Sequence, residues 1–232
     1  METILKYDLV SKLYGSKVAL ENISLEIPKG AIVGLLGPNG SGKTTLLKLT
    51  AGLLQTTLGD ISIFGHPVGP VTKNLVAYQP DKVFLNDWMI VDDLLCMMED
   101  FYDNFDKSKA LEMLKRLEIN PKDKLKTMSK GTKEKVQLIT TMCRKVGLYL
   151  LDEPIGGVDP AARDYILNTI LSNYQENATI IISTHLIAEV ESILNHVLFL
   201  KNGKIIRNGN ADEIREQEGK TIDALFREDF KC

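Results

Sequence analysis

The sequence of 232 residues is poor in several features that mark particular classes of protein. Its cysteines are Cys96, Cys143 and Cys232, and none belongs to a C-x-x-C pair, so we expect neither a disulfide framework nor a cysteine zinc site. No apolar run approaches the roughly 20 residues of a membrane span. The N-terminal residues lack the basic and then apolar pattern of a signal peptide. These absences predict a chain that is soluble by itself in a reducing cytosol.

Charge of neither sign is in marked excess. The net charge is −3, so nothing in the electrostatics favours nucleic acid as a partner. The apolar share of 44% and the charged share of 25% are ordinary for a soluble globular protein. The length fits one large domain, or one domain with a subdomain.

The most informative stretch is residues 37–45, which matches the phosphate-binding pattern G-x-x-x-x-G-K-[ST]. Residues 31–36 before it predict a buried strand, and residues 44–49 predict the start of a helix. Glycines let backbone N–H groups converge on phosphate oxygens, and a helix N-terminus adds partial positive charge. Lys43 is expected to bind the β- and γ-phosphates, and Thr44 to offer its hydroxyl to Mg²⁺. The predicted nucleotide-binding residues of this loop are Gly37, Pro38, Asn39, Gly40, Ser41, Gly42, Lys43, Thr44 and Thr45.

A second group of polar residues follows an apolar strand pattern at residues 148–151. Asp152 and Glu153 would lie at the carboxyl end of that strand, where ligands bind in α/β folds. Asp152 is expected to hold Mg²⁺, and Glu153 to polarise the water that attacks the γ-phosphate.

Three other candidate residues leave two interpretations open. Gln79 follows the strand pattern of residues 75–78, and it could reach Mg²⁺ or the attacking water, or be an exposed loop residue. His185 follows the strand at residues 179–183, and it could contact the γ-phosphate or be structural. Tyr14 could stack on a nucleotide base or pack over a hairpin.

Helical spacing of apolar residues predicts two helices between residues 87 and 119, the first with one apolar face from Val91 to Phe105. A further helix is predicted to begin at Ser129, a natural N-cap. Lys130, Lys133 and Lys135 crowd its start, where the helix dipole disfavours cations. This conflict suggests an anionic ligand there, and the alternative is a solvated lysine face.

Taken in order, these motifs resemble those of ATP-binding-cassette (ABC) ATPase subunits over essentially the whole chain. The resemblance makes Gln79 the glutamine loop, residues 129–132 the signature loop, residues 148–152 Walker B, Asp159 part of the aspartate loop, and His185 the histidine switch. It implies an α/β P-loop NTPase of the ABC type with an antiparallel β portion and an inserted helical subdomain. Residues 1–85 and 146–232 would form the nucleotide-binding core, and residues 86–145 the helical subdomain with the signature loop.

The family implies hydrolysis of ATP with Mg²⁺, with Thr44, Gln79 and Asp152 addressing the metal and Glu153, His185 and Gln79 acting in catalysis. Two cassettes would enclose two ATP molecules head to tail, with Ser129 and Gly131 completing the site of the opposite subunit and Asp159 also binding nucleotide. The expected partners are an integral membrane permease and a second ABC ATPase subunit, identical or different, and no nucleic acid. The expected location is the cytoplasm, peripheral on the inner face of the cell membrane.

The signature loop departs from the usual Leu-Ser-Gly-Gly-Gln, since it is Met128-Ser-Lys-Gly-Thr132. This variant resembles cassettes of bacterial ABC-2-type exporters of peptides and antimicrobials. Trp88 and Met89 are candidates for the wall of a groove that receives the permease. The main alternative is a soluble single-cassette ATPase that acts as an assembly or regulatory factor. A phosphate-loop kinase would leave residues 128–132 and His185 unexplained.

Overall fold

The computed structural model describes residues 2–156, 160–174 and 177–231. Its centre is a six-stranded sheet in the order β10-β9-β3-β8-β7-β6. The strands are β10 (Lys204–Asn210), β9 (His196–Lys201), β3 (Ile32–Leu36), β8 (Thr179–Thr184), β7 (Leu148–Asp152) and β6 (Val76–Gln79). From β9 to β6 all neighbours are parallel, and only β10 pairs antiparallel with β9.

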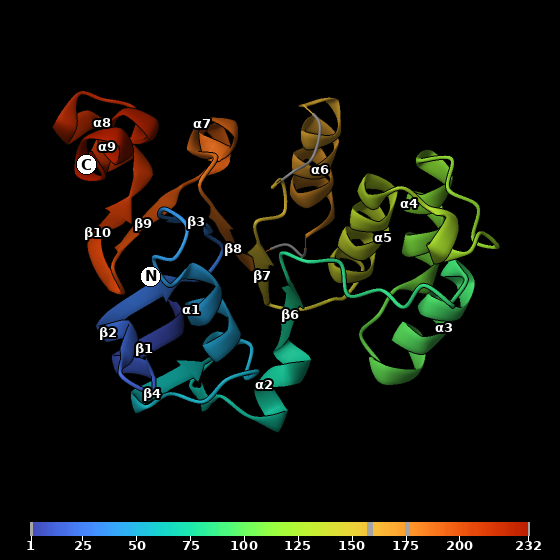
Figure 1. Ribbon diagram of the computed structural model, residues 1–232, viewed down its shortest axis with the longest axis horizontal. Helices are drawn as coiled ribbons and strands as arrows, with labels where there is room; N and C mark the ends of the chain where they lie inside the picture. The colour runs from blue at the N-terminus through green and yellow to red at the C-terminus, as the bar shows by residue number, and fades with distance from the viewer. Residues whose placement is uncertain (1, 157–159, 175–176, 232) are drawn as a thin grey trace.

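An antiparallel sheet packs against this central sheet at the lower left of Figure 1. Its order is β2-β1-β4-β5, from β2 (Lys17–Pro28), β1 (Thr3–Tyr14), β4 (Leu58–Ile63) and β5 (His66–Pro67). The apolar side chains of β1 and β2 pack with those of β3 and α1 (Lys43–Thr50) in one core. The antiparallel β portion predicted from the sequence is therefore confirmed.

A second core covers the opposite face of the central sheet. There β7 and β8 pack against α6 (Pro160–Asn173), α7 (Ile187–Val190), α8 (Ala211–Glu218) and α9 (Ile222–Asp229). Every residue of β7 and β8 is buried, as expected for parallel strands covered on both faces. The 3₁₀ turn at Glu191–Ile193 belongs to this part of the chain, whereas the short helix α2 (Pro70–Leu75) lies beside β6, near the antiparallel sheet (Figure 1).

The helices between β6 and β7 form a body of their own at the right of Figure 1. It contains α3 (Val91–Phe101), α4 (Lys107–Arg116), a 3₁₀ turn at Leu125–Thr127 and α5 (Lys130–Met142). Buried residues between Leu85 and Cys143 make a third, separate core. The single helix face predicted from Val91 to Phe105 is wrong at its end, because α3 stops at Phe101 and Phe105 forms an isolated bridge with Arg144.

Candidate nucleotide-binding site

The loop at residues 37–42 joins the end of β3 to the start of α1, as its motif predicts. Gly40 and Gly42 have φ values of 81° and 114°, in the left-handed region that favours glycine. A Cβ at Gly37 would lie 2.4 Å from the carbonyl oxygen of Leu200, so no other residue fits there without a shift of the backbone. The backbone of this loop is therefore set by local sterics, and its N–H groups lie at the start of a helix.

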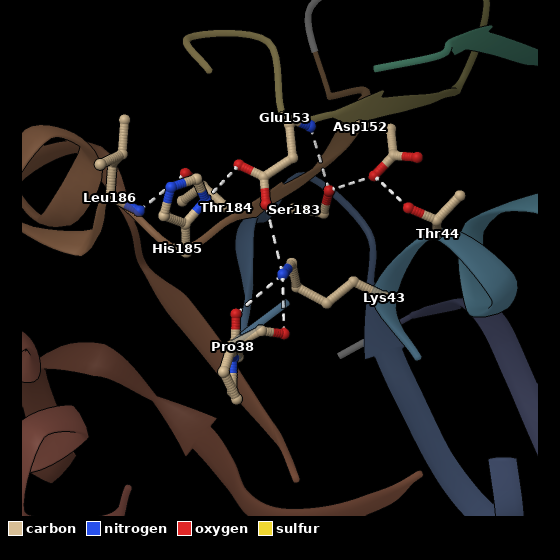
Figure 2. A network of polar contacts seen from close by, with 10 residues as sticks. Pro38, Lys43, Thr44, Asp152, Glu153, Ser183, Thr184, His185 and Leu186 are labelled. Atoms are coloured by element: carbon tan, nitrogen blue, oxygen red, sulfur yellow. Dashed lines mark hydrogen bonds and ion pairs between the residues drawn. The ribbon is translucent and has the colours of Figure 1, made fainter. Parts of the chain in front are cut away.

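Lys43 is buried at 6% exposure and points into the loop (Figure 2). Its Nζ donates to the carbonyl oxygens of Gly37 at 2.7 Å and Pro38 at 3.3 Å. The same nitrogen lies 3.2 Å from Oε1 of Glu153. One cation thus connects the phosphate loop to the carboxylate that follows β7.

Asp152 ends β7 and is fully buried. Its Oδ1 accepts hydrogen bonds from Ser183 Oγ at 2.6 Å and from Thr44 Oγ1 at 3.2 Å, and its Oδ2 accepts one from Tyr78 OH at 3.4 Å. Burial raises the pKa of this carboxyl, and the hydrogen bonds from Ser183 and Thr44 oppose that shift. Sequence reasoning missed Ser183, because a serine inside an apolar strand has no distinctive pattern.

Glu153 follows directly and adopts φ of 49°, a conformation that is uncommon outside glycine. Its backbone N–H donates to Ser183 Oγ at 3.1 Å and to the Ser183 carbonyl at 3.0 Å. Its Oε2 lies 3.0 Å from Nδ1 of His185, which comes from the end of β8 (Figure 2). The turn after β7 therefore directs this carboxylate toward both Lys43 and His185.

A cleft of about 650 Å³ opens over the phosphate loop. The predicted site residues that line it are Tyr14, Asn39, Gly40, Gly42, Lys43, Thr44, Thr45 and Glu153. Tyr14 ends β1, and its ring is about half exposed at the rim. Ser41 does not line the cleft, and its buried hydroxyl has no hydrogen-bond partner in the described part of the chain.

The structure does not bring Gln79 into the cleft. Gln79 pairs in register with Leu151, and side chains alternate along a strand, so Gln79 shares the sheet face of Leu151. That face belongs to the core with α6, whereas Tyr78 lies on the Asp152 side and bonds to it. Asp81, two residues further on, does line the cleft, and its charge contributes to raising the pKa of Asp152. In this structure the side chain that reaches the cleft from the end of β6 is therefore that of Asp81, and the metal and catalytic role expected of Gln79 has no support from its position.

Oxygen groups at and next to this cleft fit Mg²⁺ held together with phosphates: Thr44 and Asp81 line the cleft, and the buried Asp152 does not line it but accepts from the Thr44 hydroxyl. The Thr44 hydroxyl, the Asp152 carboxylate and the Asp81 carboxylate are hard oxygen donors, and Mg²⁺ is usually bound by one or two carboxylates plus substrate phosphates. Among the residues that the structure describes, no cluster of three or more His, Cys, Asp and Glu could hold a metal by protein side chains alone.

Ser129 and Gly131 lie outside the cleft of their own chain. Ser129 is exposed and caps α5, where its Oγ accepts from the Thr132 N–H at 3.1 Å. The lysines of this helix start have partners, since Lys130 pairs with Glu134 at 3.6 Å and Lys133 pairs with Asp87. Acidic residues of the same chain thus offset part of the charge that suggested an anionic ligand. Asp159 lies outside the described residues.

A second hollow, of about 690 Å³, lies between β6 and the helices α3 and α5. We call it the apolar groove, and its walls include Phe84, Met97, Met98, Phe101, Tyr102 and Arg144. The proposed wall residues Trp88 and Met89 do not line it. Met89 is buried at 3% exposure in the core of the helical body, because it packs with α3 and α5. Trp88 is 76% exposed elsewhere on the surface.

Comparison with protein families matches residues 20–156 to the model of the ABC transporter family. The uncharacterized ABC transporter ATP-binding protein YhaQ of Bacillus subtilis is 32% identical, over 97% of this chain and 78% of the relative. The lantibiotic transport ATP-binding protein SrtF of Streptococcus pyogenes is 33% identical, over 88% of this chain and 89% of the relative. The linearmycin resistance ATP-binding protein LnrL of Bacillus subtilis is 29% identical, over 93% of this chain and 72% of the relative.

Solved structures agree with these relatives. The ATP-binding subunit of an ABC transporter superimposes with a TM-score of 0.86 at 30% identity, covering 97% of this chain and 99% of the other. A nucleotide-free ATP-binding cassette from an ABC transporter superimposes with a TM-score of 0.78, and at 22% identity it supports the fold alone.

Proposed function

This chain belongs to the ABC transporter family as an ATP-binding subunit, and we propose that it hydrolyses ATP to power a membrane exporter. The observation that carries the proposal is the meeting of Lys43 and Thr44, which follow β3, with Glu153 and Asp152, which follow β7, at the carboxyl ends of parallel strands on either side of β8. In open α/β sheets, ligands bind outside these strand ends. The reaction is ATP + H₂O → ADP + phosphate.

The residues divide the chemistry between them. The loop amides and Lys43 bind the phosphates, and Lys43 exchanges its carbonyl and Glu153 contacts for phosphate oxygens. Glu153, released from Lys43, accepts the proton of the attacking water, and His185 holds its other oxygen. Thr44, Asp152 and Asp81 would hold Mg²⁺, which when bound neutralises charge on the β- and γ-phosphates. Tyr14 stacks on the base at the rim of the cleft.

The working unit that we propose contains two cassettes. Ser129 and Gly131 start α5 on the surface, away from the cleft of their own chain, so their free amides are available to a second subunit. Each signature loop would then face the phosphate loop of the other cassette. Asp159 would belong to the same interface.

The apolar groove supports a permease as partner. Two methionines and four aromatic residues line a hollow between the core and the helical body, and flexible and aromatic apolar side chains suit a docked helix. No helix in the described ranges is long and apolar enough to span a membrane. We therefore propose that a separate membrane subunit binds here and places the chain on the inner face of the cell membrane.

Export as the direction of transport is supported by two relatives. One carries lantibiotic transport in its name and another carries linearmycin resistance. We propose a peptide, antimicrobial or drug-like substrate on this basis. The competing proposal is a soluble cassette that regulates or assembles other proteins without transport.

The experiment that tests the transport proposal is recovery from membranes. A tagged Glu153→Gln protein is expressed in its native cell, fractionated with Mg-ATP and solubilised, and the proteins that copurify are identified. A stoichiometric partner with several membrane spans supports the proposal. Recovery in the cytosol with soluble partners overturns transport and leaves the ATPase chemistry standing.

A matched pair of surface variants tests the groove. Phe101 is 74% exposed on the groove wall, and Leu58 is 63% exposed on β4 of the antiparallel sheet. Phe101→Glu should abolish recovery of the membrane partner and spare basal ATP hydrolysis, whereas Leu58→Glu should change neither. Equal recovery of the partner with both variants would contradict docking in the groove.

A further inference from the structure

Residues 80–84 connect the nucleotide cleft to the apolar groove. The segment leaves β6 after Gln79 and has no regular secondary structure. Near its start, Asp81 lines the cleft. At its end, Phe84 is 54% exposed and lines the groove. These five residues therefore connect the cleft to the apolar groove. The contacts that fix the backbone of this segment also determine the position of Asp81.

A side chain of α5 holds both ends of the segment. The Nε2 of Gln137 donates to the Pro80 carbonyl at 3.1 Å, and the Oε1 of Gln137 accepts from the Phe84 N–H at 3.1 Å. Gln137 is 2% exposed, and both bonds are partly buried. The orientation of the amide follows from chemistry, because a carbonyl accepts and an N–H donates.

This pair of bonds is specific to a long amide side chain. Glutamate at this position would keep the acceptor for Phe84 and lose the donor for Pro80, and methionine would lose both. Gln137 thus provides hydrogen-bond partners for the Pro80 carbonyl and the Phe84 N–H, two backbone groups that have no strand or helix partner. Of the residues between these two bonds, Asp81 is the one that lines the cleft.

The same helix begins at Ser129, eight residues before Gln137, which is about 12 Å along a helix axis. Residues 80–84 are therefore attached to α5 through a buried amide, and Asp81 of this segment lines the cleft. Within the described part of the chain, the Asp81 side chain makes no hydrogen bond or ion pair of its own that would hold it in place.

Resting on the function proposed above, we propose that Gln137 is a positioning residue for the ATPase reaction. It holds Asp81 toward Asp152 in the cleft and makes that placement depend on the position of α5. The groove and the cleft are thereby linked through one side chain, since Phe84 lies on the groove wall.

The test compares ATP binding with and without Mg²⁺ by isothermal titration calorimetry on the full chain. For Gln137→Met we expect ATP binding in EDTA to stay as in the wild type, because Lys43 and the loop amides are untouched. The gain in ATP affinity on adding Mg²⁺ should fall on the order of tenfold, and the Mg²⁺ concentration for half-maximal hydrolysis should rise by a similar factor. Gln137→Glu should fall between Gln137→Met and the wild type.

Two further variants separate positioning from stability. Ile139→Val lies on the same helix, packs in the core of the helical body and should leave the Mg²⁺ dependence unchanged. Asp81→Asn, at an exposed position, should reproduce the Mg²⁺ defect of Gln137→Met, and the double variant should be no worse than Asp81→Asn alone.

The outcomes distinguish the two proposals. Equal Mg²⁺ dependence in Gln137→Met, Ile139→Val and the wild type would overturn the role of Gln137 and leave ATP hydrolysis intact. Effects of Gln137→Met and Asp81→Asn that simply add would overturn it as well, since the two residues would then act separately. A wild-type chain that binds no ATP would overturn the proposed function, and this inference with it.

Discussion

Removal of the Ser183 hydroxyl is the perturbation whose outcome the site geometry determines most directly. This hydroxyl donates to the fully buried Asp152 carboxylate at 2.6 Å and accepts from the Glu153 N–H at 3.1 Å. In Ser183→Ala the Glu153 N–H can still donate to the backbone carbonyl of residue 183. The hydrogen bond that is lost without replacement is therefore the one to the Asp152 carboxylate. That carboxylate would retain only the longer bonds from Thr44 and Tyr78 among its described partners.

The size of the expected loss in kcat/KM follows from the charge on the acceptor, the Asp152 carboxylate. A hydrogen bond to a charged group contributes about 1.5–3 kcal/mol. If this contribution is lost in the transition state, kcat/KM for Mg-ATP falls about tenfold to hundredfold, because 1.4 kcal/mol corresponds to about a factor of ten. We expect a similar loss in the free energy of unfolding, measured by urea denaturation.

A control for stability lies at the opposite end of the same strand. The Thr179 hydroxyl is fully buried, accepts from the Gly30 N–H at 3.0 Å and donates to the Pro28 carbonyl at 3.1 Å. Thr179→Val should lower the free energy of unfolding by about 1–3 kcal/mol with kcat/KM unchanged. Wild-type kcat/KM in Ser183→Ala, or an equal loss of activity in Thr179→Val, would refute the argument that Ser183 orients the carboxylates.

Three other predictions address the rim of the cleft and the stability of the helical body. Tyr14→Ala should raise the Kd for ATP about fivefold by calorimetry, because a stacking contact contributes about 0.5–1.5 kcal/mol, and Tyr14→Trp should restore it. Asp106 caps α4, so Asp106→Ala should cost about 1 kcal/mol of stability. Its bonds to the Lys109 N–H and to Lys145 lower the pKa of Asp106. The stability that the ionised carboxylate contributes is therefore present above a pH of about 4 and is lost as the pH falls. In urea titrations at acid pH, the wild type should lose its higher free energy of unfolding relative to Asp106→Asn. Burial raises the pKa of the Cys143 thiol to about 12, so as the pH rises the unfolded chain loses this proton before the folded chain does. The free energy of unfolding should therefore fall from a pH of about 9 upward, and it should fall less steeply in Cys143→Ala.

Local patterns, and the family resemblance that their order carries, were enough to predict the fold and most of the elements that form the candidate site. The glycines and Lys43 of the loop, and the acids after β7, follow from strand, turn and helix preferences within a few residues. Such preferences act on neighbouring backbone units, so they can be recognised without knowledge of distant contacts. The helices between β6 and β7 were predictable for the same reason, whereas the antiparallel portion was expected from the resemblance to the ABC family.

Long-range register decided the remainder. The register in which β6 pairs with β7 places Gln79 on the face away from the cleft and brings Tyr78 to Asp152. Adjacent residues of a strand lie on opposite faces of the sheet, so a register shifted by one residue would exchange these two positions. Packing of α5 against residues 80–84 gave Gln137 its partners, although a glutamine inside a helix carries no pattern of its own. These contacts join residues 53 to 74 positions apart in the chain, so their geometry depends on how whole elements pack, which local periodicity does not encode.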